Sequence, residues 1–182
     1  MRDSTLLGLR LTLGGYLAVH GAQKLFGSFG GAGLEKTGVF FERLGLKPGP
    51  AFAALAGGAE FAGGILTAAG ALSPVGPLSV AGAMSVASLT HADKGPMLQK
   101  GGFELPATNL AAALVLFSTG PGRFSFDRLI GFRLPKALTR LTVVGATALT
   151  AYSAVQVAKT KWMPDRPEAA PAAPETVATK DT

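Results

Sequence analysis

A small set of ionisable side chains interrupts segments that otherwise carry almost no charge. Glu60 stands alone between two apolar stretches, and His20, Lys24, His91 and Glu104 lie near the ends of such stretches. An ionisable residue inside a membrane is costly, so each of these is a candidate functional residue. Imidazole, ammonium and carboxylate groups can hydrogen-bond a quinone carbonyl or carry protons between water and a redox centre in the membrane.

The spacing of these residues favours one shared site. His20 and Lys24 are four residues apart, so they share a helix face, and Tyr16 extends that face by one turn. Glu60 lies well inside its apolar segment and needs a partner. We therefore predict that Glu60, together with Lys24 or His20, holds a polar ligand.

Two other interpretations stay open. Lys24 and Glu104 can be interfacial residues that extend to the lipid headgroups, an explanation that fits Glu60 poorly. His20 and His91 lie at similar depth on different segments, and two histidines can ligate a haem b iron. The chain has 2 histidines, so none would be spare, and it has no Cys for thiolate chemistry. We therefore favour a quinone over haem b and expect no metal site.

The segments that position these residues are apolar enough to cross a bilayer. Hydrophobic residues make up 48% of the 182 residues and charged residues 15%, against about 25% charged in a typical soluble domain. A spanning helix needs about 20 mostly apolar residues. The sequence therefore predicts an all-α integral membrane protein with spans at 4–26, 51–72, 74–92, 104–120 and 138–158.

In an up-down bundle, the polar residues described above meet at one end, on the side of segment 27–50. That segment predicts a short amphipathic helix at the interface, with an apolar face made of Val39, Phe40, Leu44 and Leu46. Small residues recur in the first two spans, among them Gly14, Gly21, Gly57 and Gly64. Such residues let membrane helices approach closely, because lipid gives no hydrophobic drive between helices.

The charge distribution is typical of membrane flanks. The chain has 17 basic and 11 acidic residues, a net charge of +6. The basic residues are scattered and lack aromatic platforms, so we expect no nucleic-acid binding. The densest basic loop is 123–140, and short basic loops favour the cytoplasmic side. We therefore place this loop and the N-terminus in the cytoplasm.

Several motifs, taken in order, resemble the DoxX family of small bacterial membrane proteins. They are HGAQKLFGSFGGAG (20–33), FFERLG (40–45), GGAEFAGGILTAAG (57–70), GGFE (101–104) and GPGRFSFD (120–127), all within 5–130. The resemblance implies a four-helix transmembrane bundle, here with a fifth transmembrane helix added. We expect a multi-pass protein of the bacterial inner membrane with three parts: a DoxX-like bundle (1–130), a basic loop and further helix (131–160), and a disordered Pro/Ala-rich tail (161–182).

The resemblance also implies a link to redox metabolism. Members resemble the quinone-linked subunit of a thiosulfate:quinone oxidoreductase, and some are associated with oxidative or thiol stress. On this basis we expect catalytic roles for His20, Lys24, Glu60, His91 and Glu104. We expect quinone binding by Tyr16 and Gln23.

The motif GPGRFSFD has two interpretations. In the structural one, Gly-Pro-Gly ends a span, Arg123 lies at headgroup level, and Ser125 and Asp127 cap a short helix. In the other, Arg123 and Asp127 bind a partner protein.

The observations favour an inner-membrane subunit of a redox system that faces quinone, with membrane lipids and redox proteins as partners. A non-enzymatic scaffold that recruits proteins through the basic loop or the tail is one alternative. A small-solute permease with the same polar lining is another.

Overall fold

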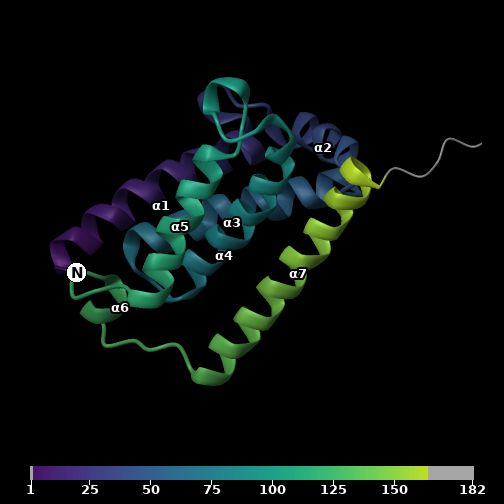
Figure 1. The fold of residues 1–182 in the computed structure, drawn as a ribbon. Helices are drawn as coiled ribbons and strands as arrows, with labels where there is room; N and C mark the ends of the chain where they lie inside the picture. Colours follow the sequence, from purple (N-terminus) through teal and green to yellow (C-terminus); the bar gives the residue numbers. More distant parts are fainter. Residues whose placement is uncertain (1, 164–182) are drawn as a thin grey trace, which may run out of the picture.

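The computed structural model describes residues 2–163, and within that range the chain is helical without a β-strand (Figure 1). The helices are α1 (Asp3–Phe26), α2 (Gly33–Arg43), α3 (Gly49–Ala69), α4 (Val75–Thr90), α5 (Glu104–Thr119), the short α6 (Phe126–Leu129) and α7 (Lys136–Trp162). Single 3-10 turns lie at Ser28–Gly30, Ala92–Lys94 and Leu98–Lys100. The expected tail falls outside the described residues from 164 onward, and its first two residues belong to α7.

Local signals explain where the long helices begin and end. α1 and α3 end on Gly27 and Gly70, both in the left-handed conformation that glycine adopts without a steric cost. α7 begins directly after Pro135, and two lysines occupy its last turn, where cations complement the helix dipole. Each of the five predicted apolar segments therefore forms a helix, with boundaries displaced by only a few residues.

Glycines allow α1 and α3 to pack with their backbones in contact. A Cβ atom on Gly14 would lie 2.5 Å from the carbonyl oxygen of Gly64, and a Cβ atom on Gly64 would lie 2.6 Å from that of Gly14. Gly21 approaches the backbone of Gly57 and Phe61 in the same way. The structure thus contains the small-residue packing that the sequence predicts.

The helices α1, α3, α4 and α5 pack consecutively around one core, and α5 also contacts α1 (Figure 1). Their shared core is made of Leu6, Leu13, Leu17, Val80, Ala81, Met84, Ala113 and Leu116. One end of this bundle holds the start of α1, the α3–α4 turn and α6. Two hydrogen bonds connect these segments: Asp3 accepts one from Arg123 N, and Asp127 accepts one from Leu72 N. The opposite end holds α2 and the loop between α4 and α5.

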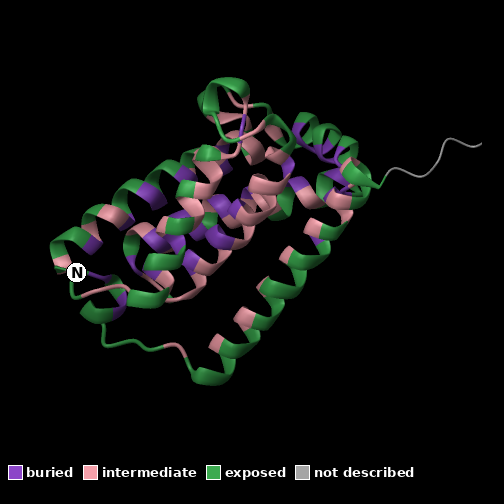
Figure 2. Ribbon diagram, viewed as in Figure 1, coloured by how far each residue is buried: buried purple, intermediate pink, exposed green. Residues whose placement is uncertain are grey.

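α7 lies beside this bundle and is mostly exposed, as Figure 2 shows. Its buried residues are Ser153 and Val157, both in its C-terminal half. The same half is held by Lys161, which donates to the carbonyl oxygen of Thr90 and pairs with Asp93. α7 is therefore attached mainly at the end of the molecule where α2 lies.

Two described helices, α3 and α7, are long and apolar enough to cross a membrane. α4 and α5 have 16 residues each, or about 24 Å at 1.5 Å per residue, which is shorter than the hydrocarbon core. Large apolar side chains face outward on α3, α5 and α7, for example Ile65, Leu114 and Leu141, the last 68% exposed. Such a surface is unfavourable in water and favourable against lipid.

Segment 27–50 forms a short helix as predicted, but α2 does not carry all four residues of the predicted apolar face. Leu44 and Leu46 are buried and follow α2 rather than lie on it. Val39 and Phe40 are about half exposed, and Phe41 is buried in their place. The reason is that α2 packs on α3, which selects the face carrying Thr37, Gly38 and Phe41.

The contact between α1 and α3 predicts a position-specific effect of alanine. Gly64→Ala is expected to destabilise the protein by about 1–3 kcal/mol, because its Cβ would overlap the Gly14 backbone. Gly58→Ala, on the same helix with open space around its Cβ, should leave stability unchanged or raise it slightly. Unfolding in detergent micelles measures both, and equal stability of the two variants would contradict the packing described.

Acidification is expected to loosen the end of α7. The hydrogen bond from Lys161 lowers the pKa of the Asp93 carboxyl below its ordinary value. A group with a lowered folded-state pKa contributes stability above its unfolded value, near pH 4, and that stability is lost as the pH falls through the folded-state value. Fluorescence of Trp162, the single Trp, should change below about pH 4. Lys161→Met should abolish this transition, and an unchanged profile in that variant would refute the assignment.

Candidate functional site

Lys24 and Glu60 form an ion pair between α1 and α3. The Glu60 side chain is 5% exposed and that of Lys24 is 28% exposed. A buried carboxylate without a partner is strongly unfavourable, and Lys24 provides the partner that the sequence predicted Glu60 to need. The position follows from the helix packing, because Lys24 and Glu60 each come three residues after a glycine of the α1–α3 contact, Gly21 and Gly57.

This ion pair lies in the wall of a cavity of about 270 Å³. Side chains of α1, α2, α3, α4 and α7 line it, and most of them are apolar. The polar part of the lining includes Lys24, Glu60 and His91. Rings of Phe52 on α3 and Tyr152 on α7 stack at the same junction of helices, with centroids 6.1 Å apart. The cavity thus has an apolar body and a few convergent polar groups, the usual composition of a ligand site.

His91 faces this cavity with a defined hydrogen-bonding state. Its Nδ1 lies 2.7 Å from the carbonyl oxygen of Gly101, and a carbonyl oxygen can only accept. Nδ1 therefore carries the proton, and in the neutral ring Nε2 is an acceptor. The loop that follows α4 fixes this tautomer.

Four of the other predicted site residues lie outside the cavity lining. Tyr16 and His20 contact each other edge to face, with ring centroids 4.4 Å apart. Gln23 Nε2 donates to the carbonyl oxygen of Phe29 at 3.4 Å, and Glu104 accepts from Leu98 N at 3.1 Å. The structure therefore brings Lys24, Glu60 and His91 into one cavity and assigns Gln23 and Glu104 local hydrogen bonds in loops.

Asp127, predicted to bind a partner, is buried and accepts hydrogen bonds from Leu72 N and Ser73 N, both at 2.8 Å. Its carboxylate joins α6 to the turn between α3 and α4. Ser125 caps α6 by accepting from Arg128 N, as the structural interpretation of this motif predicts. Arg123 is exposed, and its backbone N donates to Asp3.

Arg10 is a structural residue that the sequence reasoning missed. It is 2% exposed and donates to the carbonyl oxygens of Pro121, at 2.7 Å, and Phe124. The left-handed Gly70 leaves room for its guanidinium, which a Cβ there would strike. The available signal was that Arg10 is the single charged residue within 4–23.

The cavity groups can donate to and accept from a polar ligand in an apolar environment. Lys24 has three N–H donors, and its hydrogen bond to Glu60 uses one of them. His91 offers Nε2 as an acceptor when neutral. The arrangement suits a ligand with an apolar body and carbonyl or hydroxyl oxygens. In the described residues, no group of three or more acidic, His or Cys side chains is placed to hold a metal ion.

Comparison with protein-family models gives a match to the model described as DoxX over residues 5–93. This confirms the resemblance, over a shorter range than the 5–130 expected. The matched range contains Lys24, Glu60 and His91, and it leaves α5, α6, α7 and the GPGRFSFD motif outside. Neither the curated proteins nor the solved structures contain a match to the chain.

The ion pair predicts that removing Lys24 alone costs more stability than removing both partners. Lys24→Met is expected to destabilise the protein by about 3 kcal/mol, because it leaves the Glu60 charge buried without a partner. The double variant Lys24→Met/Glu60→Leu should recover much of that loss. Unfolding in mixed micelles measures the effects, with Lys36→Met at an exposed position of α2 as the control. Equal losses in the Lys24 and Lys36 variants would argue against a coupled buried pair.

Proposed function

We propose that the chain, whose residues 5–93 match the DoxX family of membrane proteins, is a quinone-facing redox subunit of the bacterial inner membrane. In this proposal α1, α3, α4 and α5 form the transmembrane bundle and α7 is a fifth span. The N-terminus and the 123–140 loop lie in the cytoplasm. The cavity beside Lys24 and Glu60 receives the quinone head group.

The observation that carries the proposal is the cavity itself. Its volume of about 270 Å³ is close to the lower end of ligand pockets, about 300 Å³. Its apolar lining suits a ring and a lipid-like chain, and Lys24 and His91 suit the two classes of hydrogen bond that a quinone and its reduced form require. The chemistry of the lining thus fits the group that the family resemblance implies.

A bound quinone supplies an acceptor of two electrons and two protons. Lys24 would donate a hydrogen bond to a carbonyl oxygen of the quinone, and Glu60 would orient and neutralise Lys24. His91 Nε2 would accept a hydrogen bond from a hydroxyl of the reduced form, while its Nδ1 donates to Gly101. The surrounding apolar side chains exclude water, which strengthens these polar contacts.

The proposal is tested by the quinone content of the purified protein. Wild-type protein in mild detergent should yield near-stoichiometric quinone on organic extraction and mass spectrometry. Glu60→Gln should lower that yield, because it removes the carboxylate that holds Lys24 at the cavity wall.

The matched control is Glu35→Gln, which removes a carboxylate from the exposed face of α2. This variant should retain the wild-type quinone content. Absence of quinone from all three proteins would overturn the proposal and favour the scaffold or the permease. Equal loss in both variants would show that the effect is not specific to the cavity.

A further inference from the structure

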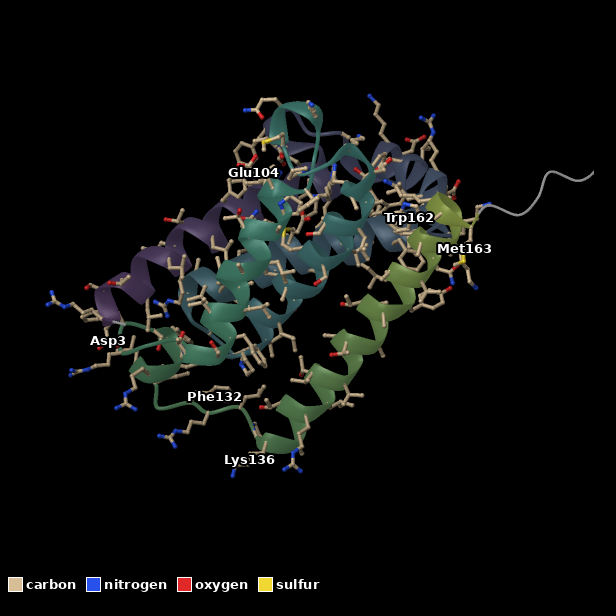
Figure 3. The ribbon with its side chains drawn as sticks, viewed as in Figure 1. Asp3, Glu104, Phe132, Lys136, Trp162 and Met163 are labelled. Atoms are coloured by element: carbon tan, nitrogen blue, oxygen red, sulfur yellow. The ribbon has the colours of Figure 1, made fainter. Side chains whose placement is uncertain are left out.

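A second hollow lies at the end of the molecule far from α2, where α6 and the connection to α7 cross the ends of the bundle helices. Its volume is about 710 Å³, and its lining includes three arginines, Arg123, Arg128 and Arg133, together with Phe132 and Leu134. All three arginines are exposed. Lys136 and Arg140 follow at the start of α7. Figure 3 labels Phe132 on this connection and Lys136 at the start of α7.

We call this hollow, lined by Arg123, Arg128 and Arg133, the basic groove. The carboxylates around it accept hydrogen bonds from backbone N–H groups. Both oxygens of Asp127 accept N–H groups of the α3–α4 turn, and Asp3 accepts the backbone N–H of Arg123. The two ion pairs of the described residues, Lys24–Glu60 and Lys161–Asp93, lie elsewhere. Asp3 and Asp127 also line the basic groove, but neither forms an ion pair with its arginines, so three guanidinium groups stand against two carboxylates and the groove keeps a net positive charge.

The same segment carries apolar side chains that face outward. Phe124, Phe126, Leu129 and Ile130 are all at least half exposed, Leu129 by 81%. They alternate with the arginines along a stretch that crosses the ends of α1, α3, α4 and α5. In a membrane, helix ends lie at the level of the lipid phosphates, so this segment presents cations to phosphates and apolar side chains to acyl chains.

We propose that the groove lined by Arg123, Arg128 and Arg133 is a binding site for the phosphate of an anionic phospholipid. The planar guanidinium group suits bidentate contact with phosphate oxygens. The exposed Phe and Leu side chains beside it lie where the lipid's acyl chains would begin, and a water-soluble anion would not use them. This combination favours a lipid over a free phosphate or an acidic peptide.

The test uses the full-length protein in nanodiscs or mixed micelles, with phosphatidylglycerol as the probe and phosphatidylcholine as the neutral lipid. Wild-type protein should bind phosphatidylglycerol selectively, as measured by native mass spectrometry and by the rise in thermal stability on its addition. Each single Arg→Gln change should weaken binding about fivefold, since each cation near an anionic surface contributes about 1 kcal/mol. The triple change should abolish selectivity.

The matched control is the triple change Lys36→Gln/Arg43→Gln/Lys47→Gln, which removes the same charge from exposed positions at the α2 end. The site is supported if lipid selectivity is kept in the control variant and lost in the triple arginine variant. If the triple arginine variant fails to fold, the three single arginine variants provide the test. An equal loss of lipid selectivity in both triple variants would show that the effect depends on net charge alone and would overturn the site. An equal response to inorganic phosphate would identify a free-anion site. Wild-type lipid selectivity in the arginine variants would overturn the proposal and leave these arginines to a protein partner.

Discussion

The direct contact between the backbones of α1 and α3 is the constraint on which the rest of the site depends. Gly14 and Gly64 leave no room for a Cβ atom between the two helices, and Gly21 approaches Gly57 in the same manner. This contact fixes both the distance between the helices and their register. Lys24 and Glu60 then meet because each lies one helical turn beyond a contact glycine, so a packing interaction positions the buried charge.

The sequence was sufficient to predict features that depend on one helix at a time. Uncharged segments located the five long helices, and the isolation of Glu60 identified a buried carboxylate that needs a partner. The choice of Lys24 as that partner was one of two possibilities, because helix periodicity places His20 and Lys24 on the same face. Only the rotation of α1 against α3 distinguishes them.

Features that arise between distant elements were not predictable in the same way. In the sequence, Arg10 is the single charged residue within 4–23. In the fold, its guanidinium joins α1 to the chain after α5, across more than a hundred residues. Likewise, the apolar face of segment 27–50 was assigned from its hydrophobic residues, but Phe41 is buried because α2 packs on α3. The residues of α7 alone do not predict which of them line the cavity, because this depends on where the helix packs against the bundle.

Because α7 docks beside the bundle, the walls of the cavity come from two different parts of the chain. Lys24, Glu60 and His91 belong to the part of the chain that the family model matches, while Ala146, Leu149, Thr150 and Ser153 belong to a helix outside it. α7 is attached at one end and joined to the bundle by an irregular connection, so its inner residues can change without disturbing the glycine contact of α1 and α3. The charged part of the cavity wall and the part that α7 supplies thus lie on separate segments of the chain, so substitutions on α7 can reshape the cavity while the Lys24–Glu60 pair stays unchanged.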